Sequence, residues 1–71
     1  MKMSPELFAE LEVAVAPLVA NFSTRNYSPM RNRWDALWQS GFSFKRLYDA
    51  GLNDNHIDTA LRRIFDSESR Q

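Results

Sequence analysis

Residues 48–65 read YDAGLNDNHIDTALRRIF, and this stretch decides the fold. Gly51 is typical of the residue just past a helix C-terminus, because glycine adopts a positive φ without a steric clash. Leu52 is expected to fold back onto the preceding helix, and Asn53 or Asp54 to cap the next one. The apolar residues of that next helix have the spacing of one buried stripe: Ile57, Ala60, Leu61, Ile64 and Phe65.

The charges of this stretch also fit a helix. Asp54 and Asp58 lie near its positive N-terminal end, and Arg62 and Arg63 lie towards its negative C-terminal end. Asp58 and Arg62 are one helical turn apart, in the order that favours attraction along a helix. The sequence therefore predicts an ion pair between Asp58 and Arg62.

The N-terminal part of the chain predicts a helix with Ser4 as its N-cap and Pro5 in its first turn. Its apolar face is expected to comprise Leu7, Leu11, Val15, Leu18, Val19 and Phe22, with Phe8 at the edge. Pro17 interrupts the pattern, since proline removes a backbone hydrogen bond and clashes with the preceding turn. The stripe keeps its phase across Pro17, which favours one kinked helix to about Asn21 over two separate helices.

A polar loop over residues 21–28, anchored by Phe22 and Tyr27, is expected to lead to the second helix. Ser28 and Pro29 repeat the start signal of the first helix, and Gly41 marks the end of the second. The inner stripe of this helix is expected to comprise Met30, Trp34, Leu37 and Trp38. Its charged residues, Arg31, Arg33 and Asp35, are expected to face away from the core.

Ser43 can cap a third helix over residues 44–50, with Phe44, Leu47 and Tyr48 directed inward. No strand pattern is visible. The sequence therefore predicts an all-α fold, a small bundle of four short helices with the last two in a helix-turn-helix-like arrangement. Residues 1–66 are expected to form a single helical domain, and residues 67–71 a polar C-terminal tail that frays.

Composition narrows the classes of function. The chain has 71 residues, 44% of them hydrophobic, with no cysteine and a formal net charge of zero. It is long enough for one small core, and nothing in it forms a disulfide or a thiolate metal site. No apolar run reaches the ~20 residues of a membrane span, and the N-terminus has no signal-peptide pattern. We expect a cytoplasmic protein that does not bind membranes.

Catalytic or metal chemistry has one candidate location. His56 is the single histidine, and Asp54 and Asp58 flank it near the start of the last helix. These residues could weakly hold a divalent cation or supply a general base. The simpler interpretation is that the acids stabilise the helix start and that His56 is a polar first-turn residue. We expect no enzyme activity, no cofactor and no metal site.

Nucleic-acid binding has two candidate locations. The two C-terminal helices have the outline of a helix-turn-helix, in which Asn53, Asn55, His56 and Thr59 could read base edges. Asp54 and Asp58 would then face phosphates, which argues against DNA. The middle of the chain is locally basic and contains Tyr27, Trp34 and Trp38, so an RNA-stacking surface is the second possibility.

A protein-binding face is the favoured interpretation of the same region. Arginine, tryptophan and tyrosine are enriched among the residues that dominate protein interfaces, and a chain this small need not enclose every aromatic side chain. The first-choice contact residues are Tyr27, Arg31, Arg33 and Trp34, and the second choice is His56 with Asn55. The expected partner is a host protein or a second copy of the chain, with DNA as the alternative.

Three segments carry a resemblance to known proteins. They are RWDALW at residues 33–38, Leu47-Tyr48, and HIDTALR at residues 56–62. Together they resemble a group of small uncharacterised proteins from phages, prophages and plasmids. The resemblance implies a mobile-element accessory protein in a bacterial cytoplasm. It assigns no functional residues, because the group has no assigned activity.

Overall fold

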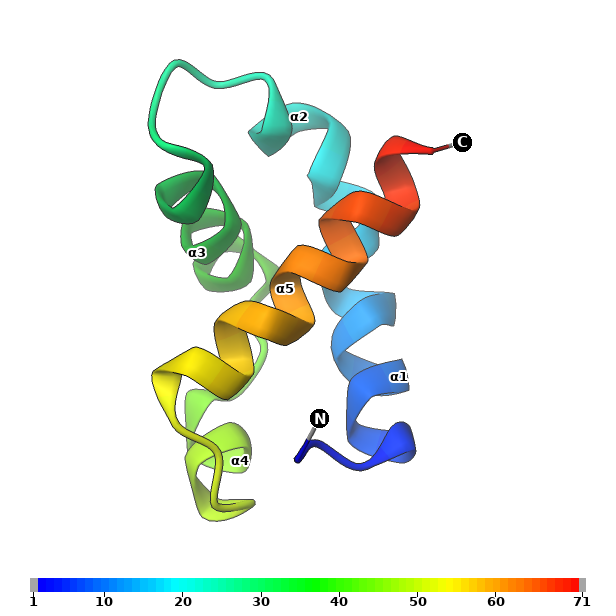
Figure 1. The fold of residues 1–71 in the computed structure, drawn as a ribbon, viewed down its shortest axis with the longest axis vertical. Helices are drawn as coiled ribbons and strands as arrows, with labels where there is room; N and C mark the ends of the chain where they lie inside the picture. The colour runs from blue at the N-terminus through cyan, green and yellow to red at the C-terminus, as the bar shows by residue number, and fades with distance from the viewer. Residues whose placement is uncertain (1, 71) are drawn as a thin grey trace.

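The computed structural model describes residues 2–70, and these residues form helices without a strand. The elements are α1 (Pro5–Val15), the 3₁₀ turn η1 (Ala16–Leu18), α2 (Val19–Ser23), α3 (Pro29–Ser40), α4 (Phe44–Asp49) and α5 (Asp54–Ser69). The α1–η1–α2 segment follows one continuous path (Figure 1), so residues 2–70 contain four helical segments. The predicted all-α class is confirmed.

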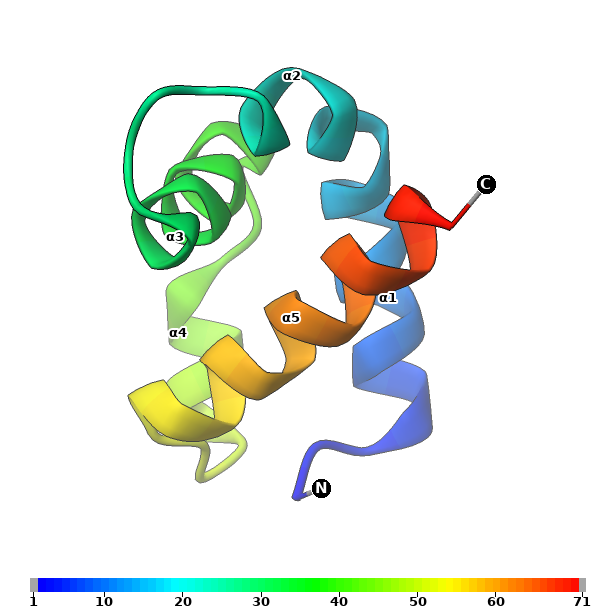
Figure 2. The same ribbon diagram turned by 45° about the horizontal axis from the view of Figure 1, so that its top comes forward.

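Helix α5 is the centre of the fold. It crosses the molecule between α3 on one side and the α1–η1–α2 segment on the other (Figures 1 and 2). Its predicted stripe is confirmed, since these five side chains are buried: Ile57, Ala60, Leu61, Ile64 and Phe65. The α1–η1–α2 segment contributes Leu7, Leu11, Val15 and Val19 to the same core.

Side-chain caps start the helices where the sequence predicts them. Ser4 Oγ accepts a hydrogen bond from the Leu7 amide at 3.1 Å, and Ser28 and Ser43 cap α3 and α4 in the same way. For α5 the cap is Asn53, whose Oδ1 accepts from the His56 amide at 2.9 Å. These bonds satisfy backbone donors that have no partner within their own helix.

Two glycines end helices in the left-handed conformation, as predicted. Gly41 has φ of 74° and Gly51 has φ of 82°. After Gly51 the chain reverses, and the Leu52 amide donates to the Leu47 carbonyl at 3.4 Å. Leu52 is 4% exposed and belongs to the core, so the turn that separates α4 from α5 also contributes apolar burial.

Pro17 changes the helix type rather than bending one helix. The prediction of a single kinked α-helix to Asn21 is wrong, because α1 ends at Val15 and Pro17 lies in a 3₁₀ turn before α2 begins at Val19. A 3₁₀ turn tolerates the missing donor and keeps the backbone helical. Val15 and Val19 consequently stay on the buried side.

Helix α3 buries only part of the expected stripe, since Leu37 is 0% exposed and Trp34 is partly buried against the core, whereas the other two members are exposed. Met30 and Trp38 are 58% and 70% exposed, and the buried residues of α3 are Asn32, Ala36 and Leu37. Tyr48 of α4 is 47% exposed as well. The inward orientation predicted for Met30, Trp38 and Tyr48 is therefore wrong.

Met30 and Trp38 are exposed because α3 packs closely against α2 and α5 through its other side. The methyl side chain of Ala36 allows helices to approach, whereas an indole ring in that place would hold them apart. The face with the small residue is therefore the one that packs.

Three further expectations need correction. Arg33 was expected to face away from the core, but its side chain is only 15% exposed and binds Asp58 of α5. Asp58 accordingly pairs with a neighbouring helix instead of with Arg62, because an arginine held across a helix contact offers a more shielded partner. The tail expected to fray after Asp66 continues as α5 to Ser69, and Gln71 lies outside the described residues.

Candidate functional site

A row of large apolar side chains runs along the outer side of α3 and onto α4. Met30, Trp34 and Trp38 are one helical turn apart and therefore line one side of α3. We call this surface the aromatic face and define it as Met30, Trp34, Trp38, Phe44 and Tyr48. The Phe44 ring lies 4.9 Å from Trp38 and 6.4 Å from Trp34 between ring centroids, so the face is continuous across the two helices.

A polar network fixes Trp34 in the middle of this face. Arg33 donates to both carboxylate oxygens of Asp58, with Nε–Oδ1 at 3.0 Å and Nη2–Oδ2 at 3.2 Å. Trp34 donates its indole N–H to the same Oδ1 at 3.2 Å. Two-point contacts between arginine and carboxylate are among the strongest polar contacts in proteins. The network therefore joins α3 to α5 and holds the indole ring in one orientation.

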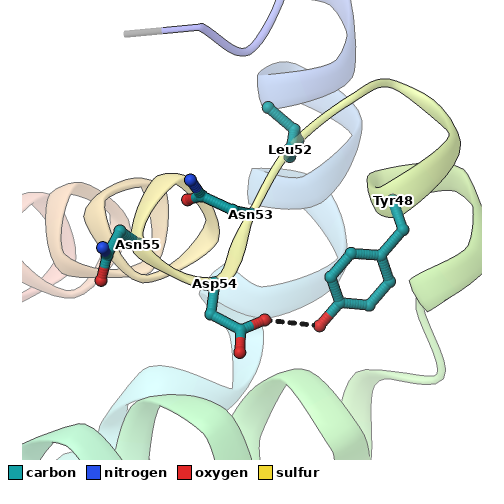
Figure 3. A pocket seen from close by; sticks show the side chains of 5 residues that line it. All are labelled: Tyr48, Leu52, Asn53, Asp54 and Asn55. Carbon is teal, nitrogen blue, oxygen red and sulfur yellow. Dashed lines mark hydrogen bonds between the residues drawn. The ribbon is translucent and has the colours of Figure 1, made fainter.

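Two cavities open beside the aromatic face. One, of about 460 Å³, lies among α3, α4 and α5 and is lined in part by Met30, Trp34, Asp54 and Asp58. The other, of about 470 Å³, is lined by Tyr48, Leu52, Asn53, Asp54 and Asn55 (Figure 3). Tyr48, Asp54 and Asn55 line both cavities, so they form the boundary between them.

Tyr48 and Asp54 are joined at that boundary. The Tyr48 hydroxyl donates to Asp54 Oδ1 at 2.7 Å, as Figure 3 shows. This hydrogen bond to a carboxylate, with smaller contributions from burial and from the negative charge, raises the pKa of Tyr48 above its usual value. The phenol is therefore a donor at neutral pH, and Asp54 is its acceptor.

The N-terminal end of α3 carries a cluster of cations around one ring. The guanidinium carbons of Arg25 and Arg31 lie 5.0 Å and 4.1 Å from the Tyr27 ring centroid. Both arginines also approach one oxygen of Asp35, at 3.6 Å and 3.7 Å. Arg31 thus lies against an aromatic ring and shares one carboxylate with Arg25.

The structure separates the four first-choice contact residues into two pairs. Tyr27 and Arg31 are exposed at the start of α3, where a partner could reach them. Arg33 and Trp34 are only partly accessible and bind Asp58. The first-choice set did not include the most exposed members of the face, Met30 and Trp38, and of these only Trp38 was considered, as part of an RNA-stacking surface.

A signal for those residues was present in the sequence. Helix α3 has two apolar rows, one with Ala36 and one with Met30, Trp34 and Trp38. Only one row of so short a helix fits a core. The row with the small residue is the better candidate for close packing, which would have left the other row to the surface.

The residues proposed to read DNA bases are used mainly at the start of α5. Asn53 caps the helix, and His56 Nδ1 accepts a hydrogen bond from the Asn53 amide at 3.2 Å, which completes a reciprocal capping box. The Thr59 hydroxyl donates to the Asn55 carbonyl at 2.8 Å. Asn55 is exposed and is the member of the set whose side chain stays available in both cavities.

The basic residues of the middle segment are largely paired. Lys45 binds Asp49, and Arg46 donates to both carboxylate oxygens of Glu10 at 2.9 Å and 2.8 Å. The hydrogen bond from Arg46 lowers the pKa of Glu10. These contacts reduce the positive field that an RNA-stacking surface would need.

The carboxylates around His56 do not converge on a common point. Asp58 binds Arg33, Asp54 binds Tyr48, and the histidine Nδ1 accepts from the backbone of Asn53. Within residues 2–70, no three histidine, aspartate or glutamate side chains are grouped as metal ligands. The geometry around His56 is that of a helix start.

Comparisons with known proteins do not add to this picture. No protein-family model matches the chain, and neither the curated proteins nor the solved structures gave a match. Among the helices of residues 2–70, none combines the length and the apolar character needed to cross a bilayer. The function is therefore inferred from the aromatic face and its surroundings.

Proposed function

We propose that this chain is a non-catalytic binding protein that acts through protein–protein contacts made by its aromatic face. The observation that carries the proposal is the exposure of Trp38 and Met30, at 70% and 58%, beside Trp34 and Phe44. Single exposed apolar residues are ordinary, but contiguous ones mark interaction sites. Tryptophan in particular is enriched among the residues that dominate binding energy.

The setting of the face supports this function. Its centre is rigid, because Trp34 is fixed by Asp58, and rigid aromatic anchors lose little conformational freedom on binding. Its ends are polar, with Tyr27 and Arg31 at the start of α3 and Asp54 at the start of α5. An apolar centre with a polar rim is the common anatomy of protein interfaces.

The nature of the partner follows from the resemblance alone. Small proteins of phages, prophages and plasmids often act by binding host factors, so the proposed partner is a bacterial host protein in the cytoplasm. The alternative is a DNA-binding regulator that uses Asn53, Asn55, His56 and Thr59. A gel shift with duplex DNA at low ionic strength separates the two proposals, because phosphate attraction is strongest there.

The experiment that tests the favoured proposal compares two surface variants of the immobilised protein. Trp38→Ser removes the most exposed ring of the aromatic face, and Val13→Ser changes a residue of α1 that is 76% exposed and lies outside that face. We expect one host protein to be retained by the wild type and by Val13→Ser and lost with Trp38→Ser. Equal retention by all three proteins would contradict the proposal.

A further inference from the structure

We propose that the cavity bounded by Trp34, Tyr48 and Asp54 receives an arginine side chain of the protein partner. This inference rests on the proposed function and names the chemistry that the aromatic face recognises. The cavity has a volume of about 460 Å³ and opens directly beside Met30 and Trp34. That volume lies within the range of about 300–1,000 Å³ found for pockets that hold small ligands.

The charged side chains that line the cavity differ in whether an opposite charge contacts them. Asp58 binds the guanidinium of Arg33 through both oxygens, so its negative charge is matched within the protein. Arg31 also lines the cavity, but its guanidinium lies over the Tyr27 ring and shares Asp35 with Arg25. Asp54 differs from both, because the partner that contacts its carboxylate is the neutral hydroxyl of Tyr48. The cavity therefore presents one negative charge that a cation can match.

The walls beside Asp54 also fit a cation. Trp34 and Tyr48 both line the cavity, and aromatic rings attract arginine and lysine through the negative potential of their faces. Asn55 lines the cavity as well and offers an amide oxygen as a further acceptor. An anionic group would meet Asp54 and Asp58 here, which excludes phosphate or a carboxylate as the favoured ligand.

Arginine fits this arrangement better than lysine. Its planar guanidinium can lie against a ring while its edge donates two hydrogen bonds to one carboxylate. Arginines of this protein already use one or both parts of this chemistry, and Arg46 uses both. Arg31 lies over Tyr27, Arg46 lies over Phe42 while it binds Glu10, and Arg33 binds Asp58 through two donors.

The test uses N-acetyl-arginine amide as the probe and N-acetyl-citrulline amide as its neutral counterpart of nearly the same shape. Binding is followed by NMR through the indole N–H of Trp34, which a Trp38→Phe variant distinguishes from the second indole of the chain. We expect a saturable shift with the arginine probe, and binding of the citrulline probe weaker by about tenfold or more.

Matched variants locate the site. Asp54→Asn removes the charge and keeps the size of the side chain, and it should abolish the shift. Asp66→Asn, which changes an exposed carboxylate in the C-terminal half of α5, should leave the shift unchanged. If Asp54→Asn does not fold, the comparison of the two probes on the wild type still decides the question.

Three results would overturn the inference. They are no shift of the Trp34 indole with the arginine probe, equal shifts with arginine and citrulline, and persistence of the shift in Asp54→Asn. Analytical sedimentation across a dilution series tests for self-association. A dimer that is lost in Trp38→Ser would mean that a second copy of the chain, and not a partner's arginine, occupies the face. Failure of the arginine test with retained, Trp38-dependent partner binding would leave the proposed function intact.

Discussion

Helices α5 and α3 both carry apolar rows, yet only α5 buries the row that its sequence indicates. Helix α5 lies between α3 and the α1–η1–α2 segment, so its stripe is covered from both sides (Figure 2). Helix α3 packs against α5, α1 and α2 with Ala36 and Leu37 and leaves Met30 and Trp38 in solvent. The comparison teaches that periodicity identifies an apolar row, whereas the side of the helix on which its neighbours lie decides whether the row is core or surface.

The largest expected effect compares one truncation in each helix. Leu61→Ala should lower the free energy of unfolding by about 2–5 kcal/mol, because Leu61 is 0% exposed and its removal leaves a cavity. Trp38→Ala should cost only about 1 kcal/mol, since it mainly loses a ring contact with Phe44. Urea unfolding of both variants measures the two losses. Similar losses would remove the distinction between the two rows.

The next effect concerns the network that joins the two helices. Asp58→Ala leaves Arg33 and the Trp34 indole N–H without their acceptor in a partly buried site, which should cost about 1.5–3 kcal/mol. Replacing the ion pair by Arg33→Met with Asp58→Leu should cost less, because no buried charge remains unpaired. A double-mutant cycle measured by urea unfolding gives both values. A double replacement as costly as the sum of the two single ones would argue against coupling.

The smallest effect is a change in one titration. With Tyr27→Phe as background, Tyr48 is the single tyrosine, and its ionisation can be followed by phenolate absorbance. Asp54→Asn should lower the pKa of Tyr48 towards its ordinary value, because the raised pKa comes mainly from the hydrogen bond to Asp54. An unchanged pKa in Asp54→Asn would show that the contact does not persist in solution.

The raised pKa of Tyr48 also determines how the stability of the protein changes with pH. A raised folded-state pKa means that the protonated phenol is favoured by folding. The contribution of Tyr48 to stability is therefore complete below the unfolded-state tyrosine value of about 10 and is lost as pH rises through the folded-state value. Asp54→Asn should reduce this dependence at alkaline pH, as thermal unfolding over that range would detect.

Local signals predicted the fold well. Ser4, Ser28 and Ser43 each accept a hydrogen bond from the backbone amide three residues further along, so a short stretch of sequence contains the whole interaction. The stripe of α5 was equally readable, because α5 has neighbours on both sides. Pro17 was harder, since a proline fits both a kinked α-helix and a 3₁₀ turn.

The candidate site depended on long-range contacts and was predicted only in part. Arg33 and Asp58 are 25 positions apart, and nothing near either residue indicates its partner. Trp34, Tyr27 and Arg31 could be selected by residue type alone. The exposure of Trp38 was missed, because it depends on which row of α3 meets the rest of the protein, and only the small Ala36 in the other row indicated that choice.

The short helix α4 has a consequence for how the cavity behaves over time. Among the described residues, no other helix lies along α4 in the way that α3 lies along α5. It is attached by Leu47 in the core, by the contacts of the Phe44 ring with α3, and by two exposed polar contacts, Tyr48 with Asp54 and Arg46 with Glu10. Amide hydrogens of α4 should therefore exchange with solvent before those of α5, in a local opening that leaves the core intact. Tyr48 belongs to α4, so one wall of the cavity lies on a segment whose amides exchange before those of α5. An occupant of the cavity would slow that exchange.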